Sequence, residues 1–175
     1  MSALKYSFAP VVRQGCTVLL LGSLPGDASL QQAEYYAHPR NVFWRMMGEL
    51  CEFSPELPYA ARLGCLNAAG IALWDVVRAG QREGSSDANI REVQPNDIPS
   101  LLREYGTIRA ICCNGGAAFR LLRRFYGGGE VLSRYQVLQL PSTSPAAARM
   151  SYAEKLSTYR AALAPLLPKG LPARG

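Results

Sequence analysis

The sequence of 175 residues has one histidine, five cysteines and no long apolar run. About 20 consecutive apolar residues are needed to span a bilayer, so we expect no transmembrane helix and no membrane partner. The N-terminal segment MSALKYSFAP lacks a basic region followed by an apolar core, and we therefore expect no signal peptide. These absences, with an apolar content of 49%, predict a globular cytoplasmic protein.

The cysteines do not indicate a metal centre. Cys16, Cys51 and Cys65 are isolated in the sequence, and Cys112 and Cys113 are adjacent. None forms a C-x-x-C pair, and a single histidine provides no zinc-ligand spacing. We expect reduced, buried thiols, no iron–sulfur cluster, and neither a metal nor another cofactor.

The charge is basic but moderate. Lysine and arginine together number 19 against 13 acidic residues, which gives a net charge of +6. Arginine far outnumbers lysine, and its planar guanidinium binds phosphate in a bidentate manner. This balance is compatible with a nucleic-acid partner, although basic chains without one are common.

Short apolar runs alternate with amphipathic segments along the chain. We expect strands at 17–21, 71–77, 108–113 and 135–140, and helices at 41–53, 58–67, 97–105, 117–126 and 151–167. Asn96 or Asp97 is the expected cap of the third helix. The polar stretch 78–94 predicts a long loop. Alternating strands and helices are typical of an α/β fold with a mostly parallel sheet, here a single domain over 1–175 with a core of about 16–167 and a basic tail at 168–175.

Four polar or glycine-rich segments follow the predicted strands. GSLPG and YYAHPRN come after the first strand, Asp75 lies in the second, NGG follows the third, and PSTSP follows the fourth. Ligands of open parallel sheets bind at the carboxyl ends of the strands. We therefore expect these segments to converge on one site.

No familiar hydrolase or nucleotide signature explains that site. GSLPG is neither a G-x-G-x-x-G motif nor a P-loop. Ser23 or Ser142 with His38 and Asp75 contains the residue types of a catalytic triad, but no serine lies in a G-x-S-x-G elbow. An ester or amide hydrolase is therefore a weak alternative.

The ordered set GSLPG, AHPRNVFW, GIALWDVV, NGG and PSTSP resembles the uracil-DNA glycosylase superfamily, most closely its hypoxanthine-DNA glycosylase branch, from about residue 16 to 160. The resemblance implies a three-layer α/β/α sandwich with a short, mostly four-stranded parallel sheet. It implies a monomeric, monofunctional DNA glycosylase without a cofactor that flips out and hydrolytically excises a deaminated base, chiefly hypoxanthine. Its partner would be DNA that contains such a base.

Two positions depart from the superfamily pattern and direct attention to a third. Leu24 stands where many members have a polar residue that orients water, and Leu140 stands where many have His or Asn near the leaving base. The hypoxanthine branch places its catalytic Asn in the AHP-x-N element, which is Asn41 here. A carboxamide can hold a water without a tuned pKa. The alternative role of Asn41 is a helix N-cap.

The resemblance also assigns residues to the base. They are Gly22, Ser23, Tyr36, Asp75 and Asn114, with Gly26 as a further candidate. We expect Tyr36 to stack on the flipped base and the Asp75 carboxylate to accept N1–H of hypoxanthine. The glycine-rich turn would present backbone N–H groups. The alternatives are a core tyrosine, an aspartate that orients a loop, and ordinary turns at the glycines and at Asn114.

The segment after the fourth strand resembles the loop that enters the DNA duplex. Its residues in that role are Ser142, Thr143, Ser144, Pro145 and Ala146. Arg40, Arg91 and Arg149 are candidate phosphate contacts, or simply solvated surface arginines. His38 is expected to shape its loop, with a role near the leaving base as the alternative.

Two other functions remain open at this stage. One is a broader uracil or xanthine glycosylase, which would use the same chemistry. The other is a catalytically silent DNA-binding protein of this fold, because Leu24 and Leu140 replace polar residues.

Overall fold

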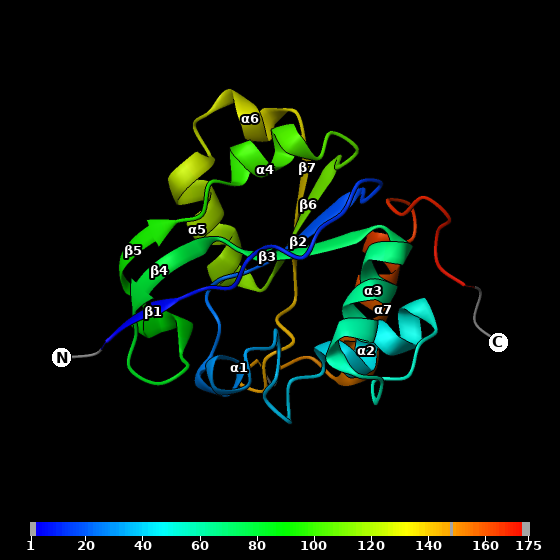
Figure 1. Cartoon of the computed structure of the whole chain (residues 1–175), viewed down its shortest axis with the longest axis horizontal. Helices are drawn as coiled ribbons and strands as arrows, with labels where there is room; N and C mark the ends of the chain where they lie inside the picture. The colour runs from blue at the N-terminus through cyan, green and yellow to red at the C-terminus, as the bar shows by residue number, and fades with distance from the viewer. Residues whose placement is uncertain (1–2, 148, 173–175) are drawn as a thin grey trace.

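The computed structural model describes residues 3–147 and 149–172, so the last three residues of the predicted basic tail lie outside the described part. Its centre is a four-stranded parallel sheet (Figure 1). The strands, in spatial order, are β3 (Ile71–Asp75), β2 (Val18–Gly22), β6 (Ala110–Asn114) and β7 (Gln136–Leu140). The predicted short parallel sheet is therefore confirmed.

The central strand β2 is buried along its whole length. Val18 and Leu20 point into one apolar core, and Leu19 and Leu21 point into the other. This follows from the alternation of side chains along a strand. A strand covered on both faces needs a continuous apolar run, and for that reason β2 is easily recognised in the sequence.

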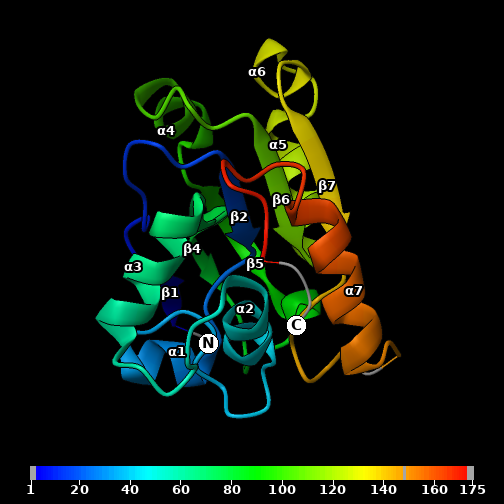
Figure 2. The same cartoon turned by 90° about the vertical axis from the view of Figure 1, so that its right-hand side faces the viewer.

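Helices cover both faces of the sheet (Figures 1 and 2). The first layer contains α2 (Phe43–Cys51), α3 (Tyr59–Ala69) and α7 (Tyr152–Leu163). The opposite layer contains α4 (Ile98–Glu104), α5 (Gly116–Tyr126) and the short α6 (Glu130–Ser133). The predicted three-layer α/β/α arrangement is confirmed, with helix ends displaced by a few residues from the predicted bounds.

The prediction of a long loop at 78–94 is wrong. The chain there forms β4 (Val77–Gln81), the 3-10 helix η1 (Asp87–Asn89) and β5 (Arg91–Pro95), and β4 pairs with both β5 and β1 (Leu4–Tyr6) in an antiparallel sheet. β5 is mostly exposed, and the β4–β5 ladder has shifts in register. Such strands lack the apolar alternation that identifies a strand in a sequence. The predicted strand 71–77 is correspondingly divided at Val76.

Two further elements were expected differently. Directly after the glycine-rich turn GSLPG, Asp27–Gln32 forms the short helix α1, which is not among the expected helices. Asp97 caps α4 by accepting a hydrogen bond from Ser100 N at 3.1 Å. Asn96 instead donates its side-chain amide to the backbone oxygen of Asp75 at 2.8 Å.

The cysteines are free thiols, as predicted. Cys112 and Cys113 lie in opposite cores, and burial raises the pKa of each to about 12. Cys16 is buried, whereas Cys51 and Cys65 are partly exposed.

No helix within the described ranges is long and apolar enough to cross a membrane.

Candidate active site

A pocket of about 380 Å³ lies at the carboxyl edge of the parallel sheet. Gly22 ends β2, Asp75 ends β3 and Asn114 ends β6, and all three line the pocket. The PSTSP segment follows β7 and forms another wall. The pocket lies within the size range of small-molecule sites, and the predicted convergence of the strand ends is observed.

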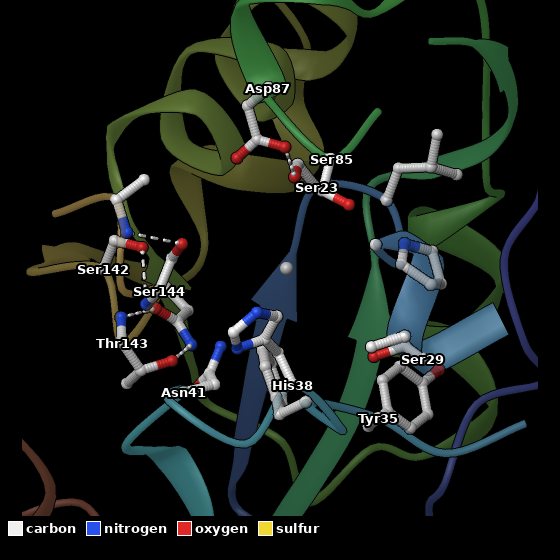
Figure 3. Close-up of a pocket in the computed structure, with 18 of the residues that line it drawn as sticks. Ser23, Ser29, Tyr35, His38, Asn41, Ser85, Asp87, Ser142, Thr143 and Ser144 are labelled. Carbon is white, nitrogen blue, oxygen red and sulfur yellow. Dashed lines mark hydrogen bonds between the residues drawn. The ribbon is translucent and has the colours of Figure 1, made fainter. Parts of the chain in front are cut away.

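The structure brings most of the predicted site residues together. The pocket is lined by Gly22, Ser23, Gly26, Tyr36, His38, Asn41, Asp75, Asn114, Ser142, Thr143, Ser144, Pro145 and Ala146. Figure 3 shows Ser23 with Asp87 on one side, His38 and Asn41 on another, and Ser142 to Ser144 at a third. The predicted phosphate contacts Arg40, Arg91 and Arg149 are exposed and do not line the pocket.

Asp75 is the most deeply buried acidic group of the pocket, with 3% of its surface exposed. Its Oδ2 has no hydrogen-bond partner among the described residues. Burial and, to a smaller extent, the nearby charge of Asp87 raise the pKa of Asp75 to about 7, although Arg82 acts in the opposite direction. A carboxyl group with this pKa is largely protonated below neutral pH, so it can donate a hydrogen bond as well as accept one.

Tyr36 lies beside this carboxyl group. The Tyr36 hydroxyl oxygen and Asp75 Oδ1 lie 3.1 and 2.5 Å from the point that a Cβ on Gly22 would occupy. The hydroxyl is buried without a partner in the described part of the chain, and burial and the Asp75 charge raise its pKa. Tyr36 has a φ of 56°, an uncommon left-handed conformation for a bulky residue. One face of its ring stacks on the ring of Phe43, with the two ring centroids 4.0 Å apart. Only the opposite face of the Tyr36 ring is therefore available to a base.

Asn114 is tied to the PSTSP segment. Its Nδ2 donates to Thr143 Oγ1 at 2.9 Å, and its Oδ1 accepts from Thr143 N at 3.0 Å. The same segment is held by Lys155, whose Nζ donates to Ala147 O, and by Tyr159, whose hydroxyl donates to Pro141 O, each at 2.8 Å. These bonds fix the segment against β6 and α7. Asn114 therefore braces this wall whether or not it also contacts a ligand.

Asn41 lies at the start of α2. Its Oδ1 accepts a hydrogen bond from Phe43 N at 3.0 Å, two residues on, which forms a turn that leads into α2. The N-cap of α2 is Val42 and not Asn41, as had been the alternative expectation. The oxygen keeps a second lone pair, and the amide keeps its two N–H donors.

His38 accepts a hydrogen bond at its Nδ1 from Arg40 N, at 3.1 Å. The neutral His38 ring consequently carries its proton on Nε2.

The sequence reasoning missed a group of residues from the β4–β5 connection. Ser85, Ser86 and Asp87 line the pocket, and Asp87 Oδ1 accepts a bond of 2.6 Å from the Ser23 hydroxyl. The buried Arg82 also bonds to Asp87. The signal available in the sequence was the dense polar run REGSSD within the predicted loop.

Arg82 connects this segment to the turn after β2. Its guanidinium donates to the backbone oxygens of Leu24, Pro25 and Gly84. Only 1% of its surface is exposed. An arginine in this position satisfies several carbonyl groups at once through its fork of N–H donors. Arg82 is thus a structural residue that holds two walls of the pocket together.

The polar groups of the pocket are mostly hydroxyl, amide and carboxyl side chains. Within residues 3–147 and 149–172, no three His, Cys, Asp or Glu side chains are grouped so that they could hold an ion. The carboxyl groups that line the pocket, those of Asp27, Asp75 and Asp87, are accompanied by hydroxyl and amide side chains. Such groups bind organic ligands through hydrogen bonds.

Comparisons with known proteins agree with this arrangement. A sequence model of the Uracil DNA glycosylase superfamily matches residues 10–166. A protein named Hypoxanthine DNA glycosylase from Methanosarcina acetivorans is 37% identical over 149 residues, which cover 85% of this chain and 91% of the relative. A second protein of that name, from Methanosarcina barkeri, is 38% identical over 112 residues, covering 63% of this chain and 71% of the relative.

A solved structure has the same fold. It is the solution NMR structure of a protein from Methanosarcina acetivorans described as a candidate uracil DNA glycosylase. The two chains are 35% identical with a TM-score of 0.73, and the match covers 89% of this chain and 94% of the other.

Proposed function

The chain belongs to the uracil DNA glycosylase superfamily, and from this we propose that it excises hypoxanthine from DNA that contains deoxyinosine. The observation that carries the proposal is the pocket at the sheet edge, whose inner polar atoms, Tyr36 Oη and Asp75 Oδ2, have no partner among the described residues. Buried polar groups are normally hydrogen-bonded. A base inserted into the pocket would supply the missing partners.

Excision begins when the target nucleotide leaves the base stack and enters the pocket. The wall formed by Ser142 to Ala146 is the DNA-binding loop, and it is held in place by Asn114 and Lys155. The hydroxyl groups of this loop suit contacts to phosphate oxygens. Arg40 and Arg149 are exposed and lie close in the sequence to residues that line the pocket. They are available for further phosphate contacts.

The chemical step replaces the bond from C1′ to the base with a bond from C1′ to water. We assign the positioning of this water to Asn41, because its carboxamide lines the pocket and its oxygen retains a lone pair after accepting the bond from Phe43 N. Leu24 also lines the pocket, and Leu140 is packed in the core. Neither leucine side chain can orient water or a base. The other carboxamide of the pocket, Asn114, is bonded to Thr143 through both its nitrogen and its oxygen, which favours Asn41 for that task. Neither a metal nor a cofactor takes part in this scheme, and the enzyme acts as a cytoplasmic monomer.

A duplex-cleavage assay tests the proposal. Duplexes with a single deoxyinosine, deoxyuridine or deoxyxanthosine are incubated with the protein, and abasic sites are then cleaved with alkali. Cleavage at deoxyinosine that exceeds cleavage at the other two supports the proposal. Equal cleavage at all three identifies a broader glycosylase, and binding without cleavage identifies a DNA-binding protein. The Asn41→Ala variant, purified in parallel, controls for contaminating glycosylases.

A further inference from the structure

Asp75 is a buried acidic group that forms no ion pair with a cation among the described residues. Arg82 is the cation that acts on its pKa, but the Arg82 guanidinium bonds to Asp87 and to backbone oxygens instead. The described part of the chain offers no hydrogen-bond donor to Asp75 Oδ2. An ionised carboxylate in such a place is strongly unfavourable. The protonated acid is therefore the favoured form of Asp75 below neutral pH.

The groups around Asp75 reinforce this state. Those that interact electrostatically with it are Asp87, Arg82, Tyr35, Tyr36 and Tyr59. The tyrosines are neutral at physiological pH, and Asp87 opposes the effect of Arg82. Burial remains the largest influence and raises the pKa of Asp75 to about 7. A proton donor with this pKa is well matched to general acid catalysis near neutrality.

The proposed reaction has a need that this acid can meet. Hypoxanthine leaves C1′ through N9 and takes the electron pair of the broken bond, so negative charge develops on the ring. Leu140 is apolar and buried at the position where the superfamily pattern often has a polar residue near the leaving base. His38, the other candidate, uses Nδ1 to accept a bond from Arg40 N.

We propose, on the basis of the function proposed above, that Asp75 is the general acid of the reaction and gives its proton to N7 of hypoxanthine as the bond from C1′ to N9 breaks. In this role Asp75 touches the base as a donor. This proposal differs from the expectation that Asp75 accepts N1–H as a carboxylate, and the two are told apart by the experiment below.

The step is balanced in protons and electrons. The C1′–N9 bond breaks with its electron pair moving to the purine, whose N7 takes the Asp75 proton. The water held by Asn41 forms the new bond to C1′ and releases one proton to solvent. The Asp75 carboxylate regains a proton from solvent after the base leaves. Hypoxanthine departs neutral, and no oxidant, reductant or further reactant is required.

This role defines a class of substrate. Purine nucleotides have a basic N7 outside the glycosidic bond, and hypoxanthine and xanthine share it. Uracil attached through N1 has no second basic ring nitrogen, so an acid at this place assists its departure less. Proton donation by Asp75 thus favours the excision of deaminated purines over that of deaminated pyrimidines.

The test is the pH dependence of single-turnover excision from a deoxyinosine duplex between pH 5 and 9. The wild type should excise at a constant rate below about pH 7 and lose about tenfold per pH unit above it. Asp75→Asn should lower the rate at pH 6 by roughly 10²- to 10⁴-fold and remove this decline. His38→Gln and Asp97→Asn should keep the decline. Asp97 is a matched control, since it caps α4 and does not line the pocket.

Several outcomes would overturn the inference. A rate that rises with pH would identify Asp75 as a carboxylate that accepts N1–H. A decline that persists in Asp75→Asn, or that disappears in His38→Gln, would assign the acid to another group. A wild type that excises nothing at any pH would reject the proposed function itself.

A binding measurement separates catalysis from positioning and folding. The affinity of Asp75→Asn for a duplex with a non-cleavable 2′-fluoroarabino analogue of deoxyinosine should stay within about threefold of the wild type, because an acid contributes mainly in the transition state. A parallel loss of affinity and rate would make Asp75 a binding residue only. If Asp75→Asn does not fold, Asp75→Glu tests the same point, since it should retain a decline in rate at high pH.

Discussion

Asp75 Oδ1 lies 2.5 Å from the point that a Cβ on Gly22 would occupy, and the two residues are paired across β2 and β3. Real Cβ contacts are essentially never this short. The absence of a side chain at residue 22 therefore lets the Asp75 carboxyl lie over the end of β2. The Tyr36 hydroxyl occupies the same space, so this one glycine determines how three parts of the pocket meet.

Gly22→Ala is expected to displace the Asp75 carboxyl and the Tyr36 hydroxyl. Overpacking of this kind lowers the free energy of unfolding by roughly 1–3 kcal/mol, and we expect deoxyinosine excision to fall by at least about tenfold because the acid moves. Gly64→Ala in α3 is the matched control, since a Cβ there meets nothing within 4 Å. Excision and chemical denaturation are measured for both, and normal excision by Gly22→Ala would contradict the assignment.

Asn41 has two roles that substitution can separate. Asn41→Ala removes both the acceptor for Phe43 N and the water ligand, so we expect about 1 kcal/mol less stability and at least a hundredfold loss of excision. Asn41→Ser keeps an oxygen that can accept from Phe43 N and should restore stability but not excision, because its side chain is shorter. Single-turnover rates of excision and denaturation midpoints are measured for both variants. Recovery of excision in Asn41→Ser would reduce Asn41 to a residue that orders the turn before α2.

The pKa of Asp75 predicts how stability changes with pH. The folded chain holds a proton on Asp75 up to about pH 7, whereas an ordinary aspartate loses it near 3.8. The stabilising contribution of this proton is complete below pH 3.8 and is lost as the pH rises to about 7. Asp75→Asn should therefore gain stability relative to the wild type over this interval, by roughly 2–4 kcal/mol at pH 8. Denaturation at pH 4, 6 and 8 measures it, and a constant difference would contradict the raised pKa.

The charge of Asp87 is, after burial, the second influence that raises the pKa of Asp75. Asp87→Asn keeps an oxygen to accept the bonds from Ser23 and Arg82 but removes that charge. The pKa of Asp75 should fall, and the pH at which excision declines should fall with it. The measurement is the same pH profile of single-turnover excision. A midpoint that does not move, or that moves to higher pH, would contradict the coupling.

Arg82, which follows β4, should contribute far more to the free energy of unfolding than Arg78, which lies in β4. Arg82→Met leaves the backbone oxygens of Leu24, Pro25 and Gly84 without their partner, and we expect a loss of at least about 3 kcal/mol. Arg78→Met, a change of the same type at an exposed position, should stay within about 0.5 kcal/mol. Urea denaturation compares them. Similar losses in the two variants would refute the proposed linkage.

The parallel sheet could be predicted because its strands are continuously apolar. Leu19 and Leu21 belong to one core and Leu20 to the other, and no polar position interrupts the run. The second sheet could not be predicted, because β5 is largely exposed and β1 has only three residues. Its stability depends on pairing between distant segments, such as Lys5 with Gly80, and such pairing leaves no local pattern.

The site residues that end or directly follow a strand of the parallel sheet could be predicted. Gly22, Asp75 and Asn114 end strands of one parallel sheet, so topology alone brings them together. Asp87 was missed because it lies in a connection between antiparallel strands, whose position depends on the buried Arg82. The alternative that Asn41 is the N-cap of α2 was wrong by one residue, since Val42 is the N-cap. Asn41 instead accepts a bond from Phe43 N, and its role in catalysis stays a proposal.

The central claim is that this chain hydrolyses the bond between deoxyinosine and its base. The direct measurement is the free base released from a duplex with one deoxyinosine, identified by mass spectrometry under single-turnover conditions and compared with the abasic sites formed. We predict one hypoxanthine for each abasic site, an unbroken strand before alkali treatment, and at least a hundredfold less of both with Asn41→Ala. Intact deoxyinosine after prolonged incubation with a protein that binds the duplex would contradict the account.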